Sequence, residues 1–323
     1  MKPIFIGVGA AFFFAFTFVL NRSMELVGGS WIWSASLRYI FMIPFLLVIV
    51  LVRRNFGALL VEMKRNLLSW IIWSFVGFGL FYAPLCFAAA YSPGWLIAGT
   101  WQVTIISGAL LAPLFYELRS LDDGVVKIRG GISFRGLSMS LIILLGIAIM
   151  QMEQAKELSG VALLLGVLPV LVASFAYPLG NRKMMEVCEG RLDPYQRVLG
   201  MTLASLPLWL LLSLYGLIVE GPPTGQQSVQ ALLVAVSSGV IATVLFFRAT
   251  DMVRGNMQKL AAVEATQSIE VLFALIGEVF VLSAPLPSLL SWLGMMLVII
   301  GMVLHSYLSN KPVAVSTTKG VAQ

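Results

Sequence analysis

The sequence contains few charged residues. They make up 11% of the 323 residues, and apolar residues make up 59%, whereas a soluble domain carries about a quarter charged residues. The mean hydropathy is +0.94. This composition excludes a water-soluble domain, because one or two ordinary cores could not hide so much apolar surface. It also excludes an intrinsically disordered chain, collagen and a coiled coil.

Cysteine and histidine are scarce as well. The chain has two cysteines, Cys86 and Cys188, and one histidine. Neither their number nor their spacing suggests a disulfide framework or a metal site. The G-x-x-x-x-G-K-[ST] loop of ATP-driven pumps is absent, and so is any catalytic triad. We therefore expect no metal, no cofactor and no enzyme.

Long apolar runs dominate the sequence. Val198–Val219 and Leu289–Leu308 contain no charged residue, and at about 1.5 Å per residue each run is long enough to cross the roughly 30 Å hydrocarbon core. A transmembrane β-barrel would instead show alternating segments of about ten residues. We predict an all-α integral membrane protein, one membrane domain over 1–323 with a cytoplasmic tail at 310–323. Its ten transmembrane helices are predicted at 3–21, 31–52, 67–90, 94–116, 136–152, 160–181, 195–219, 231–251, 257–282 and 288–309.

Positive charge is distributed unevenly between the two ends of these helices. Of 21 Lys and Arg residues, 16 lie at the N-terminus, after even-numbered helices or in the tail, and two lie after odd-numbered helices. The positive-inside rule then places both termini in the cytoplasm of a multi-pass cell-membrane protein. The net charge of +6 suits anionic headgroups, so we expect the lipid bilayer, and no nucleic acid, as a partner.

The two halves of the sequence resemble each other. Arg38 and Arg197 lie early in the second and seventh predicted helices, and Glu117 and Glu278 close the fourth and the ninth. Each pair is separated by about 160 residues. Matches between helix n and helix n + 5 indicate an internal duplication.

Five helices in each repeat place equivalent residues on opposite sides of the membrane. We therefore predict two inverted five-helix repeats, at residues 1–152 and 160–309. Inverted repeats are typical of transporters that work by alternating access, since two similar halves can exchange conformations and open toward opposite sides. A channel or a scaffold does not need this symmetry.

Several motifs are shared with a known group of carriers. They are Phe81–Ala90, Ser92-Pro93-Gly94, Thr100-Trp101-Gln102, and Gly277-Glu278 before a last helix with Gly294 and Gly301. With the two five-helix halves, they resemble the drug/metabolite transporter superfamily, and more narrowly its ten-helix branch of multidrug resistance efflux transporters. The resemblance implies a proton- or exchange-driven carrier, commonly an exporter, with its cavity between helices 1–4 and 6–9. The four-helix relatives use a Glu in their first helix; the helices predicted at 3–21 and 160–181 contain no acid.

Two glutamates lie inside the predicted ninth helix. Glu264, Gln267, Ser268 and Glu270 fall within about 160° of one face. A charge near the bilayer centre costs about 2.5–3.5 kcal/mol on insertion scales, so this stripe must face a cavity or other helices. We predict that Glu264 or Glu270 binds a proton and a cationic substrate in turn, with Glu264 preferred because it lies nearer the equivalent of the polar face in the fourth helix. The alternative is a structural Glu that pairs with an Arg.

Other helices supply further candidates for the substrate cavity. Thr100 and Thr104 share one face of the fourth helix, although small hydroxyls also permit close helix packing. Aromatic faces suit organic cations, which makes Tyr82, Trp101 and Tyr177 candidates as well.

Arginines inside the predicted helices have several possible roles. Arg38 lies about 10 Å inside the second helix, where it is either the counter-ion of a buried Glu or the ligand of an anionic substrate group. Arg248 and Asp251 are three residues apart near the inner end of the eighth helix, where they can form an ion pair or Arg248 can snorkel to the interface.

These observations leave three functions open. The first is a secondary active transporter that exports cationic or amphipathic small molecules by alternating access in exchange for protons or another coupling ion. The second is an exporter of amino acids or other metabolites, in which Arg38 meets a carboxylate. The third is a membrane partner protein that transports nothing. Buried acids favour the first.

Overall fold

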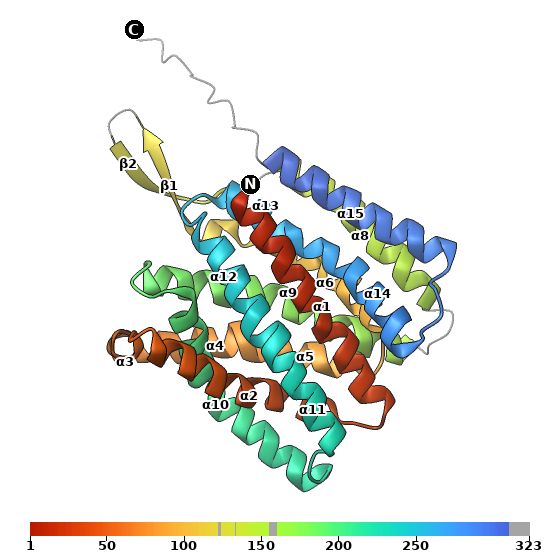
Figure 1. The fold of residues 1–323 in the computed structure, drawn as a ribbon. Helices are drawn as coiled ribbons and strands as arrows, with labels where there is room; N and C mark the ends of the chain where they lie inside the picture. Colours follow the sequence, from red (N-terminus) through yellow and green to blue (C-terminus); the bar gives the residue numbers. More distant parts are fainter. Residues whose placement is uncertain (122–123, 133, 155–159, 310–323) are drawn as a thin grey trace.

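The computed structural model describes residues 1–121, 124–132, 134–154 and 160–309 (Figure 1). Within these ranges, seven helices are long and apolar enough to cross a membrane, and two shorter apolar helices accompany them. The prediction of a helical integral membrane protein is therefore confirmed. The seven long helices are Lys2–Leu26, Trp31–Val52, Leu67–Ala89, Gly160–Cys188, Pro194–Val219, Gly225–Asp251 and Ala262–Leu282.

The helices of the first half follow the predicted ranges, with interruptions. Residues Phe75–Gly79 form a π-helical segment between α4 and α5. The helices are α1 (Lys2–Leu26), α2 (Trp31–Val52), α3 (Phe56–Arg65), α4 (Leu67–Ser74), α5 (Leu80–Ala89), α6 (Gly94–Trp101), α7 (Val103–Leu110) and α8 (Phe134–Gln154).

The helices of the second half are interrupted as well. A π-helical segment, Ala235–Ala242, joins α11 to α12, and a 3₁₀ segment, Ala265–Ile269, joins α13 to α14. The helices are α9 (Gly160–Cys188), α10 (Pro194–Val219), α11 (Gly225–Val234), α12 (Thr243–Asp251), α13 (Met257–Glu264), α14 (Glu270–Leu282) and α15 (Leu289–Ser309).

The prediction of a helix over 94–116 is wrong in its second half. The helix breaks at Gln102, ends at Leu110 and is followed by a 3₁₀ turn that contains Pro113, a residue that removes a helical hydrogen bond. The antiparallel strands β1 (Tyr116–Leu121) and β2 (Gly124–Arg129) then form a hairpin, which projects from the helical body in Figure 1. The chain is thus helical in its membrane body but not all-α throughout.

Two other boundaries differ from the prediction. The short helix α3 occupies a segment that was predicted as a loop, and its last turn carries Lys64 and Arg65, which favour a helix C-terminus. Helix α9 continues to Cys188, beyond the predicted end at residue 181. This extension brings Arg182 into a helix, although the run of polar residues there predicted a cytoplasmic loop.

The helices pack closely where glycines face one another. α8 and α15 lie side by side at one edge of the bundle (Figure 1), and a Cβ at Gly146 would lie 2.5 Å from the carbonyl oxygen of Gly294. In the same way, a Cβ at Gly180 in α9 would lie 2.3 Å from the Cα of Gly77. Small residues of this kind let membrane helices approach closely. α1 packs against α6, α12 and α14, so it lies next to the elements that carry the candidate site.

Candidate functional site

Three polar side chains of the α13–α14 helix share one edge. Glu264 ends α13, Gln267 lies in the 3₁₀ segment, and Glu270 begins α14. In a 3₁₀ helix, side chains three residues apart eclipse each other. The segment therefore aligns these three residues more closely than the α-helix that the sequence predicted. The two carboxyl groups lie along the edge, separated by about 12 Å of helix at 2 Å per residue.

Glu270 is buried without an ionic partner. Its exposed fraction is 1%, and its Oε1 atom has no hydrogen-bond partner. No Lys or Arg nitrogen of the described residues lies within 4 Å of its carboxyl group. Burying a carboxylate without a partner in a membrane costs free energy. Glu270 is therefore a candidate for binding a proton or a ligand.

Glu270 borders a small central cavity of about 10 Å³. Its walls are largely aromatic: the ring of Phe81 lies 4.5 Å from that of Tyr177 and 5.1 Å from that of Trp101, between centroids. The residues that line it are Phe14, Thr17, Phe18, Phe81, Leu85, Trp101, Tyr177, Gln267 and Glu270. An acid among aromatic faces is a suitable environment for an organic cation.

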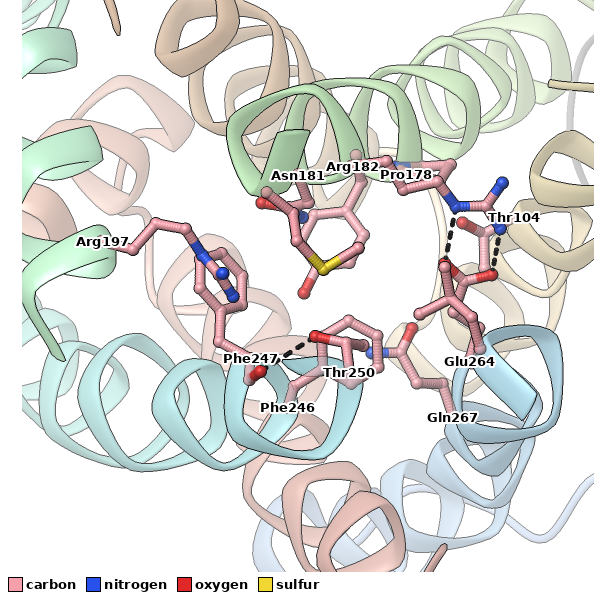
Figure 2. A pocket seen from close by; sticks show the side chains of 13 residues that line it. Thr104, Pro178, Asn181, Arg182, Arg197, Phe246, Phe247, Thr250, Glu264 and Gln267 are labelled. Carbon is pink, nitrogen blue, oxygen red and sulfur yellow. Dashed lines mark hydrogen bonds and ion pairs between the residues drawn. The ribbon is translucent and has the colours of Figure 1, made fainter. Parts of the chain in front are cut away.

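Glu264 forms a buried ion pair with Arg182. Its two carboxylate oxygens accept from Arg182 Nε at 3.0 Å and from Nη2 at 2.5 Å, as the dashed lines in Figure 2 show. Arg182 Nη1 donates to the carbonyl oxygen of Gly108 at 2.7 Å. This bidentate geometry satisfies both charges. It favours the structural alternative for Glu264, which the sequence had ranked ahead of Glu270 as the binding residue.

The ion pair borders a second small cavity of about 20 Å³ (Figure 2). This cavity lies toward the start of α13, and Gln267 and Tyr177 line both it and the central cavity. Its lining residues are Thr104, Tyr177, Pro178, Asn181, Arg182, Met185, Arg197, Phe246, Phe247, Thr250, Leu260, Glu264 and Gln267. The two cavities therefore follow the edge from Glu264 to Glu270.

Arg38 is buried but has no carboxylate partner. Its exposed fraction is 2%; Nη2 donates to Ser238 Oγ at 3.0 Å, whereas Nε and Nη1 have no partner. The guanidinium lies 3.9 Å from the ring centroid of Tyr82, a cation–π distance. Ser238 also accepts from Thr17, which lines the central cavity. The predicted ion pair between Arg38 and a buried Glu is not present among the described residues.

The two broken helices meet beside the central cavity. Gln102, at the break between α6 and α7, donates through Nε2 to the carbonyl oxygen of Gln267 at 3.2 Å. Its side chain is fully buried. A helix break frees backbone groups that a neighbouring side chain can satisfy, and Gln102 does so for the carbonyl of Gln267 in the 3₁₀ segment. The sequence predicted both segments as continuous helices, at 94–116 and 257–282, and did not indicate the breaks.

Of the remaining predicted residues, one lines the second cavity and the others form hydrogen bonds within and between helices. Thr104 lines the second cavity and donates to the carbonyl oxygen of Ser174 at 3.1 Å. Thr100 and Ser268 donate to carbonyl oxygens of their own helices, as packing hydroxyls commonly do. Thr100 also accepts from Gln151 at 2.6 Å. It therefore contacts α8 and does not line either cavity.

Sequence reasoning missed several residues of the site. Arg182, Ser238, Thr17 and Asn21 lay in segments that were interpreted as helix ends or plain helix. The Asn21 amide is hydrogen-bonded to the Tyr82 hydroxyl at 3.2 Å, and the ring of Tyr82 faces the Arg38 guanidinium. Buried polar residues within apolar runs are the signal that could have found Thr17 and Ser238.

Ion pairs gather at the end of the bundle where α9, α10 and α12 meet. Asp251 forms an ion pair with Arg197 at 2.6 Å, so the predicted pairing of Asp251 with Arg248 is wrong. Glu62 of α3 accepts from Arg191 in the α9–α10 connection at 2.9 Å through each oxygen. This bidentate bond with the Arg191 guanidinium lowers the pKa of Glu62 below its usual range. The described residues contain no group of three potential metal ligands.

Comparison with known proteins gives a family and two close relatives. The family model "EmrE: Putative multidrug resistance efflux transporter" matches residues 1–311. The chain is 61% identical over 310 residues to "Uncharacterized protein YjlA" of Bacillus subtilis (strain 168), covering 96% of each chain. It is 53% identical over 270 residues to "Uncharacterized 42.1 kDa protein in intracellular alkaline protease 3'region" of Shouchella clausii, covering 84% of this chain and 70% of that protein.

One solved crystal structure has a similar fold. It superimposes with a TM-score of 0.65 over 95% of this chain and 97% of that chain, at 13% sequence identity. At this identity the similarity shows the fold alone.

Proposed function

Because the chain belongs to the multidrug resistance efflux transporter family of the drug/metabolite transporter superfamily, we propose that it is a proton-coupled exporter of cationic or amphipathic small molecules. In this proposal Glu270 binds a proton and the cationic group of the substrate in turn. Trp101, Tyr177 and Phe81 hold the apolar part of the substrate, and Gln267 lies between the central and the second cavity. No metal or cofactor takes part.

The observation that carries this proposal is the isolation of Glu270. It is a carboxyl group at a cavity deep in the bundle, with an unsatisfied oxygen and no arginine, whereas Glu264 on the same edge is neutralised by Arg182. A proton or a substrate cation can neutralise Glu270 in its place. Since both compete for one carboxylate, binding of one expels the other, which is the basis of exchange.

Alternating access is the proposed mechanism. The two π-helical segments and the two helix breaks occur at corresponding places in the two halves, and discontinuous helices in corresponding places are typical of transporters with inverted repeats. We propose that α8, α15 and the α6–α7 pair complete ten crossings in two inverted five-helix repeats. The charge distribution supports a cytoplasmic location for both termini and for the second cavity.

The proposal is tested by flux in proteoliposomes. A pH gradient is imposed, and the movement of labelled organic cations, zwitterions and neutral metabolites is measured for the wild type, Glu270→Gln and Glu264→Gln. We expect cation flux in the wild type and loss of at least about a hundredfold in Glu270→Gln, since the amide cannot exchange a proton. Substrate binding should become independent of pH in that variant.

Controls separate the proposed role from loss of folding. Gln is nearly isosteric with Glu, and Ser268→Ala offers a control on the same segment, since the Ser268 hydroxyl bonds only to its own backbone. Unchanged, pH-dependent flux in a folded Glu270→Gln variant would remove Glu270 from the mechanism. Absence of flux for every compound in the wild type would favour the partner protein that transports nothing.

Export of metabolites is the second candidate, and Arg38 favours it. A guanidinium with two unsatisfied nitrogens suits a carboxylate or phosphate group, and Ser238 and Thr17 connect Arg38 to the central cavity. If zwitterions alone are transported, and Arg38→Gln abolishes their flux, this second function replaces the first.

A further inference from the structure

A third cavity lies at the other end of the α13–α14 helix. Its volume is about 440 Å³, and it opens where α14 ends, where α1 ends and where α6 begins. We call it the vestibule. Its lining residues are Arg22, Leu26, Pro93, Trp95, Met150, Glu278, Leu282, Ser283, Ala284, Pro285, Leu286, Pro287, Ser288 and Ser291. The second cavity and the vestibule therefore lie at opposite ends of the helix that carries Glu270.

Glu278 lines the vestibule and holds the start of α6. Its Oε1 accepts from the backbone N–H of Gly94 at 2.6 Å. A carboxylate there is stabilised by the unpaired N–H groups and by the dipole of the helix. Glu278 has an exposed fraction of 1%, and its Oε2 has no hydrogen-bond partner. One oxygen thus makes a contact between helices, and the other is left unsatisfied beside the vestibule.

The Glu278–Gly94 contact lies between the vestibule, which Glu278 lines, and Phe18, which lines the central cavity. A Cβ on Gly94 would lie 2.6 Å from the carbonyl oxygen of Phe18 and 2.7 Å from Glu278 Oε1, so α1, α6 and α14 meet here with no room for a side chain. Phe18 lines the central cavity on the other side of this contact. Separating α6 from α14 at this point would connect the two cavities.

The charged surroundings of Glu278 are simple. Arg22 of α1 shares the vestibule with it, and Arg22 donates to the carbonyl oxygen of Ala89 at 2.9 Å. The other described elements that border Glu278 there present no ionisable side chain: Trp95 comes from α6, Met150 from α8, and the residues after α14 are apolar, prolines or serines. The charge state of Glu278 therefore depends on Arg22, on the helix N-terminus and on the vestibule.

We propose that Glu278 is a proton-operated gate on the vestibule side. As a carboxylate it holds the N-terminus of α6 against α1 and α14 and keeps the central cavity closed to the vestibule. When a proton from vestibule water binds Oε2, Glu278 becomes a neutral carboxylic acid. Its hydrogen bond from the Gly94 N–H is then no longer charge-assisted, so Glu278 holds α6 less strongly. The gate then opens. Its use in a transport cycle rests on the proposed function, whereas its existence does not.

Cysteine accessibility tests the gate without any transport assay. Phe14 lines the central cavity, so we place a cysteine there (Phe14→Cys) and add a membrane-impermeant maleimide on the vestibule side. In the otherwise unchanged protein we expect slow labelling at neutral pH and faster labelling at acidic pH. Glu278→Gln should label about five- to tenfold faster at every pH, because its amide oxygen can accept from Gly94 but carries no charge. The chain without the engineered cysteine gives the background, since Cys86 and Cys188 are fully buried.

Two further variants make the outcome decisive. Glu25→Gln is the matched control: Glu25 lies near Arg22 at the same end of α1, with no hydrogen bond to α6 among the described contacts. Glu278→Asp keeps a carboxyl group on a shorter side chain. At neutral pH its labelling rate should therefore be higher than that of the parent, and the rate should still increase at acidic pH. The gate is overturned if Glu278→Gln labels like its parent, or if Glu25→Gln has the same effect as Glu278→Gln. Gated labelling in a chain that moves no substrate would refute the proposed function and leave the gate in place.

Discussion

Glu264 and Glu270 lie on one edge of the α13–α14 helix, and Glu264 is the one that meets a guanidinium. Glu264 Oε2 lies 2.5 Å from Arg182 Nη2, and both side chains are nearly buried. Removing one member of a buried pair leaves the other charge uncompensated. We expect Arg182→Gln and Glu264→Gln each to destabilise the protein by about 3–5 kcal/mol.

The double variant separates this ion pair from other roles of the two residues. Without either charge, no member of the pair is left as an unpaired buried charge, so Arg182→Gln with Glu264→Gln should be more stable than the sum of the single changes predicts. Thermal unfolding in detergent measures this coupling. Strict additivity would show that the two side chains do not depend on each other.

The bundle depends on the close approach of Gly77 and Gly180. A Cβ at Gly180 would lie 2.3 Å from the Cα of Gly77, and backbone cannot move aside as a flexible side chain does. We expect Gly180→Ala to destabilise the protein by about 1–3 kcal/mol or to prevent folding. Gly9→Ala in α1 is the matched control, because no atom lies within 4 Å of its Cβ position. Equal stability of the two variants, measured by thermal unfolding, would contradict this packing.

The sequence predicted a helical membrane protein and most of its long apolar helices, but the helix at 94–116 and the site only in part. Apolar runs locate membrane helices because each must match the thickness of the bilayer. The breaks at Gln102 and at Ala265–Ile269 were not predicted. A carbonyl freed in the second break, that of Gln267, is satisfied by the Gln102 side chain, 165 residues away in the sequence. Arg182 was missed for a similar reason. The polar run around it is typical of a loop. Its burial in a helix depends on partners far away in the sequence, namely the carboxylate of Glu264, 82 residues away, and the carbonyl of Gly108.

The Glu62–Arg191 pair gives an expected pH dependence. Because the folded-state pKa of Glu62 is lowered, its stabilising effect is complete above the unfolded pKa, near 4.5, and is lost as the pH falls through the folded value. We expect a loss of about 1 kcal/mol, since the Arg191 side chain is 35% exposed and water screens the pair. Unfolding temperatures below pH 5 should therefore fall less steeply in Glu62→Gln than in the wild type. Parallel curves would show that the pair does not contribute.

We predict the orientation of the bundle from the charge distribution, and it can be tested at two exposed positions. Gly57 in α3 belongs to the end that we place in the cytoplasm, and Gln226 in α11 belongs to the opposite end; both are exposed. With Gln226→Cys, a membrane-impermeant thiol reagent should label intact cells. With Gly57→Cys, it should label only cells made permeable, because the positive-inside rule places that end inside. The reverse pattern would invert the bundle, and the Glu278 gate would then respond to cytoplasmic protons.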